Sequence, residues 1–417
     1  MSKSKKIIKA TAGFVKNKSI VIREFLGKST IVMKEFLSSQ ASAGIILFIF
    51  AVFAALIANS GYYDIYKSFF AFQIPIDIPV LDIYKKMDLK LWIDDGFMAI
   101  FFLLVGLELK REVSIGELSS KAKVSLPLFA AIGGVIFPMA IYWFFNHSDP
   151  AAIRGVAIPA ATDIAFAVGI LSLFGNRISY SLKIFLVALA IIDDLIAILI
   201  IAIFYTEELH TNFLLLAGIT MVILFGLNRA RISSLIPYLL LAPILWLFVL
   251  KSGIHATIAG VALAMFIPLS RDKAVSSPAK KLEHFLHMPV AYLILPIFAF
   301  ANSGVVFDGF SIDTLLNKVV LGIILGLFIG KQLGIMLMAW LLYKMKICKF
   351  MDNIRWLEFY GVAVLTGVGF TMSLFIGNLA FSSEHMMDNV KIGVIFGSLF
   401  SAIYGSLILF IATRKKI

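Results

Sequence analysis

Long apolar segments recur along this sequence of 417 residues and set the main limit on its fold. A helix that crosses a lipid bilayer needs roughly 20 consecutive, mostly apolar residues. Twelve segments meet that requirement, near residues 42–60, 92–109, 125–145, 154–173, 181–204, 213–227, 234–250, 253–269, 289–306, 318–343, 357–380 and 391–413. The sequence therefore predicts an all-α integral membrane protein of about 12 transmembrane helices.

The composition agrees with this class and excludes others. Hydrophobic residues make up 60% of the chain and charged residues only 15%, which lies outside the range of soluble globular proteins. The net charge of +12 does not indicate nucleic-acid binding, because the basic residues fall between apolar segments instead of forming one exposed patch. The single cysteine, Cys348, cannot form an internal disulfide, and no cofactor is expected.

The distribution of Lys and Arg predicts the orientation in the membrane. An even number of spans places both termini on one side. When the basic residues are assigned alternately to the two sides, with Lys331 left inside the membrane, the side of the termini receives 28 and the other side 8. Cytoplasmic segments carry the excess of positive charge in membrane proteins. Both termini are therefore predicted to be cytoplasmic.

Residues 1–40 are predicted to form a cytoplasmic, basic, amphipathic extension, and residues 41–417 the membrane domain. The extension holds nine basic residues and lacks the continuous apolar core of a signal peptide. Its segments REFL at 23–26 and KEFL at 34–37 are eleven residues apart, about three helical turns, so they share one helix face. This pattern favours a position on the surface of anionic lipid.

Between the first two spans, a small β-hairpin over about residues 72–90 is predicted on the outer side of the membrane. Apolar branched residues occupy every second position from Ile74 to Val80, which is typical of a strand. The two prolines between them restrict such a strand to the edge of a sheet. An exposed edge can pair with a second copy of the chain, so the hairpin is a candidate dimer contact.

Asp163, Asp193, Asp194 and Lys331 lie inside predicted spans, where ionisable residues cost free energy and are functional-site candidates. Asp163 and Asp193 are each fifteen residues from residue 178, the midpoint of the loop between two antiparallel spans, so they lie at the same depth. That depth is about 18 Å from the cytoplasmic end, near the middle of a hydrocarbon core of about 30 Å. Asp193 and Asp194 point about 100° apart as helix neighbours, so two different roles are expected.

Two spans carry helix-breaking residues next to polar groups. The first runs from Gly155 to Asp163 and includes Pro159, and the second, at 361–371, contains three glycines and two threonines. Paired interruptions in the two halves of a chain mark the binding site of a transporter, because freed backbone at membrane depth must line protein or water. We therefore expect inverted repeats whose interrupted helices cross at mid-membrane. The repeats are expected over about 125–205 and 318–413.

Each feature also has a purely structural interpretation. Asp193 and Asp194 could both be partners of Lys331, but two carboxylates against one ammonium would leave a buried negative charge. Lys331 could instead extend to the membrane interface. The glycines of the second interrupted segment could serve close helix packing. The occurrence of all these features in one chain favours a functional site.

Buried carboxylates can bind either a proton or a sodium ion. Burial and a neighbouring negative charge both favour the protonated form of a carboxyl group, so proton binding near physiological pH is expected. Sodium is a hard cation and prefers oxygen ligands such as carboxylates, hydroxyls and carbonyls. If both ions compete for the same carboxylates and the site opens to one side at a time, exchange follows without a covalent intermediate.

Seven short segments stand out in order along the chain. They are FFLLVGLELKRE at 101–112, ATDIAFA at 161–167, IDD at 192–194, LKSGIHAT at 250–257, LEHFLH at 282–287, GK at 330–331 and GVGFTMS at 367–373. In this order they resemble the NhaA family of bacterial Na+/H+ antiporters, one of the families built from inverted repeats. The resemblance covers nearly the whole chain from about residue 39 onward.

The resemblance implies roles for particular residues. Asp193 and Asp194 would form the ion and proton site, with Asp194 the direct ligand of Na+ and Asp193 the partner of Lys331. Thr162 and Asp163 would belong to the crossing of the interrupted helices. A further set matches cytoplasmic-funnel or pH-response positions, with the histidine at 255 near a helix end on the other side of the membrane. The set is Glu108, Arg111, Glu112, His255, Glu283, His284 and His287.

The resemblance also implies an activity. The chain is expected to be a multi-pass protein of the bacterial inner membrane and an electrogenic antiporter that exports Na+ or Li+ in exchange for H+. It is expected to be activated at alkaline pH, to form a homodimer through the hairpin and not to be an enzyme. The chain departs from the family in its longer N-terminal extension and in Gln332, where a proline is expected after Lys331. The second departure bears on the pH set point.

Two other functions fit parts of the sequence. An intramembrane aspartyl protease would pair Asp163 with Asp193, but it would leave Asp194 and Lys331 without a role. A zinc protease would need H-E-x-x-H on a helix, whereas residues 283–287 read EHFLH. A sodium-coupled symporter of an organic anion could use Lys331 to hold its substrate. Its solute uptake would depend on sodium but not on a pH gradient.

Overall fold

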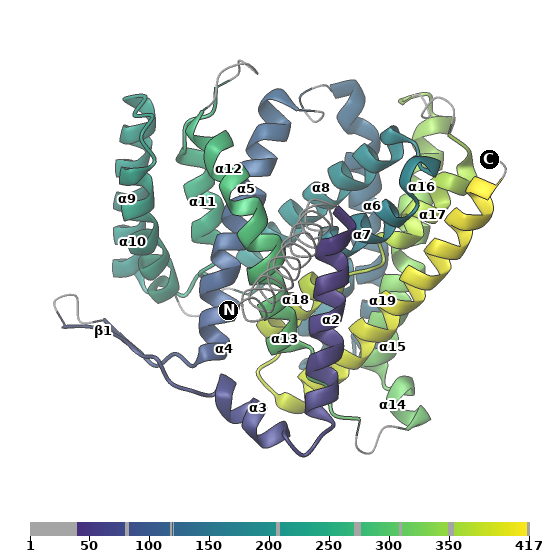
Figure 1. Ribbon diagram of the computed structural model, residues 1–417, viewed down its shortest axis with the longest axis horizontal. Helices are drawn as coiled ribbons and strands as arrows, with labels where there is room; N and C mark the ends of the chain where they lie inside the picture. Colours follow the sequence, from purple (N-terminus) through teal and green to yellow (C-terminus); the bar gives the residue numbers. More distant parts are fainter. Residues whose placement is uncertain are drawn as a thin grey trace, which may run out of the picture.

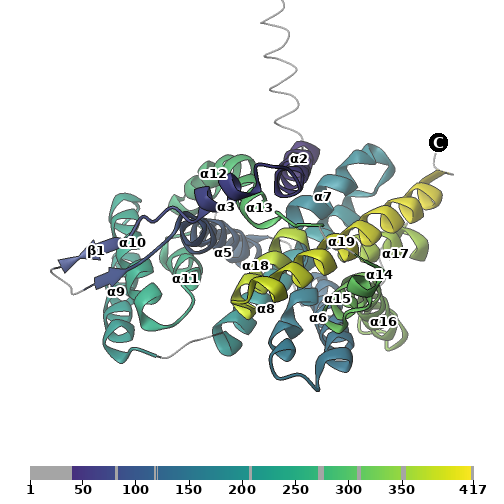
Figure 2. The same ribbon diagram turned by 90° about the horizontal axis from the view of Figure 1, so that it is seen from below.

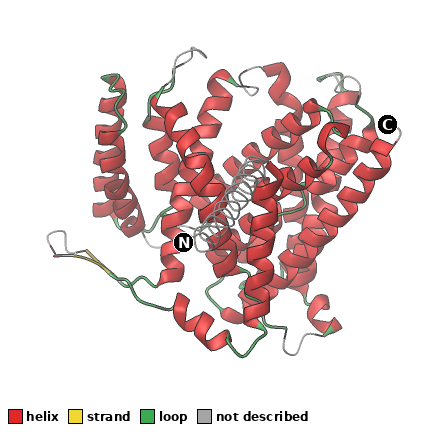
Figure 3. Cartoon of the chain, viewed as in Figure 1, coloured by secondary structure: helices red, strands yellow, loops and turns green. Residues whose placement is uncertain are grey.

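The computed structural model describes residues 40–79, 83–116, 119, 121–205, 209–270, 277–307, 311–348 and 354–414. These residues form a helical bundle from which a two-stranded hairpin projects (Figures 1 and 3). The amphipathic extension predicted over residues 1–40 lies outside the described residues, apart from Gln40 at the start of the first described helix.

Helices account for most of the described chain. The first group is α2 (Gln40–Ala58), α3 (Tyr63–Phe70), α4 (Leu89–Leu91), α5 (Met98–Ile115), α6 (Lys121–Asn146), α7 (Ile164–Leu173), α8 (Tyr180–Phe204), α9 (Thr211–Arg229) and α10 (Ile236–Ser252). The second group is α11 (Ile258–Phe266), α12 (Pro278–Pro289), α13 (Leu295–Asn302), α14 (Ile312–Leu316), α15 (Lys318–Leu325), α16 (Lys331–Lys344), α17 (Trp356–Leu365), α18 (Phe370–Ala380) and α19 (Glu384–Thr413). The π-helical turns Trp92–Phe97, Val290–Ile294 and Gly326–Gly330 lead into α5, α13 and α16.

The predicted apolar segments all contain helix, but they differ in length. Among the described residues, eight helices are long and apolar enough to cross a membrane, and the bent pair α17 and α18 would add a ninth. The segment predicted over 253–269 contains only the nine-residue α11, because Gly253 adopts a φ of 87° and the chain turns until Ile258. A multi-pass helical membrane protein is thus confirmed, whereas the count of twelve spans stays a prediction.

Large apolar side chains cover the outside of the bundle. On α2, Phe48, Phe53 and Leu56 are 52%, 54% and 64% exposed. Helices α9 and α19 carry similar exposed residues, such as Val222 and Ile403. A soluble protein rarely exposes apolar surface on this scale. Lipid tails solvate such side chains, so this surface agrees with a position in a bilayer.

The hairpin predicted over about 72–90 is present. Strand β1 (Ile76–Ile78) pairs antiparallel with β2 (Ile83–Lys85), with Ile76 opposite Lys85 and Ile78 opposite Ile83. Just beyond the strands, the Trp92 indole Nε1 donates a hydrogen bond to the carbonyl of Ile74 at 2.9 Å. This contact ties the hairpin to the start of the helix that follows it. We call the end of the bundle that carries this sheet and α3 the hairpin side (Figure 1).

Helices α6 and α16 approach closely at two glycines. A Cβ atom added to Gly334 would lie 2.0 Å from the carbonyl oxygen of Gly133, and one added to Gly133 would lie 2.4 Å from the carbonyl oxygen of Gly334. Any side chain at either position would therefore push the helices apart. Because Lys331 lies one helical turn before Gly334, this contact draws Lys331 into the interior of the bundle.

Two broken helices lie near the centre of the molecule. The first consists of the 3₁₀ helix Ala152–Ala160, an extended stretch and α7. The second consists of α17 and α18, whose axes are bent by 42° at residues 366–369. Helix α18 packs against the 3₁₀ helix, α19 and α13, and it lies in the interior when the bundle is seen from below (Figure 2).

Candidate functional site

The breaks of the two helices contact each other directly. The Asp163 amide donates a hydrogen bond to the carbonyl of Val368 at 2.7 Å. The Thr162 hydroxyl donates to the carbonyl of Thr366 at 2.9 Å. Each contact joins the extended stretch of one broken helix to the bend of the other. The freed backbone groups of one break are thus satisfied by the other, which is how irregular backbone is tolerated inside a membrane.

The Asp163 carboxylate lies between two helix N-termini. One oxygen accepts a hydrogen bond from the amide of Phe166, in the first turn of α7, at 3.0 Å. The other accepts from the amide and the hydroxyl of Thr371, in the first turn of α18, at 3.0 and 2.5 Å. Helix N-termini carry partial positive charge, so a single carboxylate compensates both dipoles. The sequence drew attention to Asp163 but not to Thr371 as its partner.

Asp193 and Lys331 form an ion pair in the interior. The Lys331 Nζ lies 2.5 Å from Asp193 Oδ2, and both side chains are fully buried. The same oxygen accepts a hydrogen bond from the Thr162 hydroxyl at 2.7 Å. The interpretation in which Lys331 extends to the membrane interface is therefore wrong, because its ammonium is paired inside the bundle.

Asp194 has a different environment from its neighbour. It is 1% exposed, and neither of its carboxylate oxygens has a hydrogen-bond partner among the described residues. Because adjacent helix residues point about 100° apart, Asp194 faces away from the ion pair of Asp193. A buried carboxylate without partners is costly unless it is protonated or binds a cation. The interpretation in which both aspartates pair with Lys331 is therefore wrong for the described residues, because only Asp193 does so.

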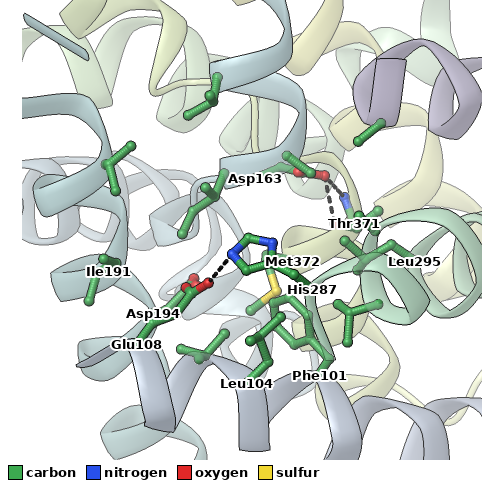
Figure 4. Close-up of a pocket in the computed structure, with 18 of the residues that line it drawn as sticks. Phe101, Leu104, Glu108, Asp163, Ile191, Asp194, His287, Leu295, Thr371 and Met372 are labelled. Atoms are coloured by element: carbon green, nitrogen blue, oxygen red, sulfur yellow. Dashed lines mark hydrogen bonds and ion pairs between the residues drawn. The ribbon is translucent and has the colours of Figure 1, made fainter. Parts of the chain in front are cut away.

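A cavity of about 460 Å³ connects this carboxylate with the crossing of the broken helices. Asp194 and Asp163 both line it, together with Thr371 (Figure 4). Glu108 and Arg111 line its far part, from the end of α5 remote from the hairpin. A second cavity of about 650 Å³ shares lining residues with the first and continues toward that end of the bundle. The shared residues are Arg111, Val168, Val187 and Ile191.

Five of the seven predicted pH-response residues form one charged group at this cavity. Its contacts are the ion pairs Glu108–His287 at 3.1 Å, Arg111–Glu283 at 2.8 Å and Arg111–Glu112 at 2.5 Å. His287 lines the cavity, with its imidazole directed toward Glu108 (Figure 4). The attraction between opposite charges in the Glu108–His287 pair exists only while the imidazole is protonated. The group therefore responds to pH in the range where histidine titrates.

The other two predicted pH-response residues lie elsewhere. His284 is exposed on α12 and makes no ion pair among the residues that the structure describes. His255 lies at the hairpin side, where its Nε2 is 3.4 Å from Asp95 and its Nδ1 is 2.8 Å from the Thr257 hydroxyl. The seven positions thus do not form a single group.

Gln332 continues helix α16 directly after Lys331. Its side chain donates to the carbonyl of Phe328 and accepts a hydrogen bond from the Tyr360 hydroxyl at 2.5 Å. A π-helical turn, Gly326–Gly330, precedes Lys331. The amide side chain therefore links α16 to α17 close to the buried ion pair. The effect of this residue on the pH set point stays a prediction.

Crossed broken helices, buried carboxylates at the crossing and a cavity that reaches them from one side define a secondary active transporter of small ions. The family model described as "Na+/H+ antiporter 1" matches residues 34–409, and the chain belongs to this family.

Individual relatives agree with this assignment. The Na(+)/H(+) antiporter NhaA of Psychrobacter cryohalolentis is 51% identical over 378 residues, which cover 90% of this chain and 94% of that protein. The NhaA of Tolumonas auensis is 51% identical over 383 residues, covering 92% and 96%. Transporters of this kind argue against the protease readings of the sequence.

The fold is also similar to a solved structure. The sodium proton antiporter MjNhaP1 from Methanocaldococcus jannaschii, solved at pH 8, superimposes with a TM-score of 0.53 over 90% of this chain and 92% of that chain. The sequence identity is 16%, so this likeness concerns the fold alone.

Proposed function

We propose that the protein exchanges Na+ or Li+ for H+ across the bacterial inner membrane, that it exports sodium electrogenically, and that alkaline pH activates it. The observation that carries this proposal is Asp194, a fully buried carboxylate on the wall of a cavity, with no hydrogen-bond partner in the part of the chain that the structure describes. Such a group can be neutral with a proton or with a sodium ion, but not with both. Competition between the two ions at one carboxylate is the physical basis of exchange.

Sodium would bind through oxygen atoms that line the same cavity. These are the carboxylates of Asp194 and Asp163 and the hydroxyl of Thr371. A hard cation prefers such ligands. When a proton replaces sodium on Asp194, the positive charge lost from the cavity is restored, and the site can return to the other side of the membrane.

The pair of Asp193 and Lys331 supports movement of more than one proton per sodium ion. Protonation of Asp193 would break its ion pair and leave a buried ammonium, which costs several kcal/mol. Release of a proton from one of the carboxylates, Asp193 or Asp194, is therefore coupled to the protonation state of the other. Net movement of positive charge inward would let the membrane potential drive sodium export.

We infer that the broken helices belong to two inverted repeats. The two groups have the same order of elements. The first group is α6, the first broken helix and α8, and the second is α15 with α16, the second broken helix and α19. Helix α6 follows the end of α5 that is remote from the hairpin, whereas α15 follows α14 at the hairpin side (Figure 1). Corresponding helices of the two groups thus start from opposite sides of the bundle, which supports an inverted relation. Relative motion of these groups about the crossing would expose Asp194 to one side at a time.

The charged group at the cavity is our candidate for pH activation. At alkaline pH the imidazole of His287 loses its proton and its attraction to Glu108. The charged group that includes Arg111 and Glu283, at the mouth of the cavity, then carries one positive charge less. We infer that this change favours entry of sodium into the cavity from the cytoplasm.

We also propose that the hairpin joins two copies of the chain. Strands β1 and β2 form a sheet of two strands, in which the Tyr84 carbonyl of β2 accepts a hydrogen bond from Lys251 Nζ at 2.6 Å, while β1 has its outer edge free of backbone partners among the described residues. Such edges pair readily with another chain. The projection of the hairpin away from the bundle (Figure 1) favours contact with a neighbour in the plane of the membrane.

The activity is tested by sodium-induced proton movement in proteoliposomes. With a pH gradient imposed across the vesicles, added Na+ or Li+ is expected to dissipate the gradient, and the rate is expected to rise from acid to alkaline pH. A membrane-potential dye is expected to report net charge movement. Correctly folded protein that moves no protons when sodium is added would contradict the proposal, and sodium-dependent uptake of an organic anion would then favour a symporter.

The orientation of the chain is tested with its natural cysteine. Cys348 follows α16 on the side opposite the hairpin and is partly exposed. A membrane-impermeant maleimide is expected to leave it unlabelled in intact cells and to label it in everted vesicles. A D77C variant in a C348S background, with its cysteine on the hairpin strand β1, should give the reverse pattern. Labelling of Cys348 in intact cells would place the termini outside.

A further inference from the structure

A second buried carboxylate lies near the hairpin side, away from the aspartates described above. Asp94, in the π-helical turn that leads into α5, is 8% exposed. It accepts hydrogen bonds from the side-chain amides of Asn302, at 2.7 Å, and Asn378, at 3.2 Å. The two amides also contact each other, since the Asn378 nitrogen donates to the Asn302 oxygen at 2.7 Å. We call these three residues the outer cluster.

The outer cluster has no neutralising partner of its own. No Lys, Arg or His of the described chain forms an ion pair with Asp94. Lys90 acts on it electrostatically from the preceding turn, and Asp88 and Asp95 act in the opposite sense. Two neutral amides donate one hydrogen bond to each oxygen of this carboxylate but do not neutralise its charge. A buried carboxylate in this situation attracts a small cation or a proton.

The amides can also serve as ligands. Rotation of an Asn side-chain amide by a half-turn exchanges its NH2 group for its carbonyl oxygen. The outer cluster then offers a carboxylate and two carbonyl oxygens from three different helical segments. This is an all-oxygen set suited to a hard monovalent cation such as Na+. Asn302 is 1% exposed, whereas Asn378 is only partly buried, so the cluster reaches toward the hairpin side.

Helix α18 connects the outer cluster to the crossing of the broken helices. Thr371, which donates to Asp163, and Asn378 are seven residues apart, so they share one face of α18 about 10.5 Å apart. Phe375 lies between them on that face and is fully buried. None of the outer cluster lines the cavity that contains Asp163 and Asp194. One face of α18 thus contacts both buried carboxylates, Asp163 through Thr371 and Asp94 through Asn378.

Phe375 forms the centre of an aromatic barrier between the two places. Its ring lies 5.4 Å from that of Phe102, 6.2 Å from that of Phe298 and 5.5 Å from that of His255. These rings come from α5, α13 and the loop before α11. Tightly packed aromatic rings exclude water and hydrated ions. Thr371 and Met372 of α18 line the cavity, whereas Phe375, further along the same helix, does not, so these rings lie between the cavity and the outer cluster along α18.

We propose that Asp94, Asn302 and Asn378 form a second cation-binding station, on the hairpin side of the Phe375 barrier, where sodium is held as it leaves or enters the exchange site. The proposal rests on the exchange function proposed above. When α18 moves with the second broken helix, Thr371 and Asn378 move together, so displacement of Phe375 would connect the two carboxylates. Sodium would then pass from the oxygen ligands of the outer cluster to those of the exchange site without entering an apolar region in which it has no ligand.

The proposal is tested with Asp94→Asn in vesicles of both orientations. Sodium concentration is varied on one side at a time, and the half-saturating concentration is measured from proton movement. For sodium offered on the hairpin side we expect this concentration to rise about tenfold, as for loss of about 1.4 kcal/mol of binding. For sodium offered on the other side we expect a change of less than twofold. Asp77→Asn, an equal change of charge on the exposed hairpin, should alter neither value.

Several outcomes would overturn the proposal. An unchanged value on both sides would remove the station, and equal increases on both sides would indicate a general structural role for Asp94. If Asp94→Asn fails to accumulate, Asn378→Ala carries the test with the same one-sided increase, at a smaller size. Binding of radioactive Na+ to purified Asp194→Asn protein separates this proposal from exchange itself. Residual binding that disappears when Asp94→Asn is added supports the station, and no residual binding contradicts it.

Discussion

Sodium-proton exchange is expected to fall at least 100-fold when Asp194 is replaced by Asn, with the protein still folded. The amide keeps the shape of the side chain but removes the charge that binds either ion. In the sodium-bound state the carboxylate would be the counter-charge of the ion, and loss of one partner of a buried charge pair costs about 3–5 kcal/mol. At about 1.4 kcal/mol per tenfold, this corresponds to a loss of roughly 100-fold or more. The measurement is the initial rate of sodium-induced proton movement in proteoliposomes at alkaline pH.

Stability provides the control for this variant. Asp194 has no hydrogen-bond partner among the described residues, so its replacement by Asn breaks no protein contact. It also removes the free-energy cost of a buried anion, so the melting temperature should be unchanged or higher. Asp77→Asn, on the exposed hairpin, should retain full exchange. Wild-type exchange by a well-folded Asp194→Asn protein would sink the role assigned to this carboxylate.

Lys331→Gln is expected to lower the free energy of unfolding by about 3–5 kcal/mol, because it leaves the buried Asp193 carboxylate without its counter-charge. The pair is fully buried and joined at 2.5 Å, so solvent cannot compensate the loss. The double variant Asp193→Asn with Lys331→Gln should recover most of the stability, since two neutral amides can hydrogen-bond to each other. Thermal unfolding in detergent, followed for wild type, both single variants and the double variant, measures this coupling.

The matched control lies on the same helix. Lys344, at the end of α16, is exposed, with its ammonium 4.9 Å from the centre of the Trp340 ring. Lys344→Gln changes the charge by the same amount but should cost little, because its ammonium is solvated. If the two single variants at the buried pair simply add in the double variant, Asp193 and Lys331 do not interact as the geometry requires.

The buried site was largely predictable from the sequence because ionisable residues are rare inside apolar segments. Each one carries a free-energy cost that only a partner or a function offsets, so Asp163, Asp193, Asp194 and Lys331 stand out. Counting residues from the loop placed Asp163 and Asp193 at one depth. The hydrogen bond from Thr162 to Asp193 agrees with that depth. The helix breaks were visible for the same reason, since Gly and Pro are conspicuous in a long apolar run.

Other features were not predictable in this way. The outer cluster joins Asp94 to Asn302 and Asn378 across 208 and 284 residues of sequence. Asparagines near predicted span ends give no signal of their own, because such positions are often solvated. The turn that shortens α11 depends on the positive φ of Gly253, and a glycine in an apolar segment is compatible with helix as well as with a turn.

The amino-acid sequence alone was sufficient for the membrane class, the approximate helices, the hairpin and the carboxylates buried inside the bundle, because these follow from hydropathy, from periodicity and from the cost of buried charge. It could not specify which helices are neighbours. Apolar side chains surround each span, so hydropathy does not distinguish a face that meets lipid from one that meets protein. The pairing of Asp193 with Lys331, the isolation of Asp194, the division of the predicted pH-response residues and the ring contacts of Phe375 depend on contacts between distant segments, and these exist only once the helices have packed.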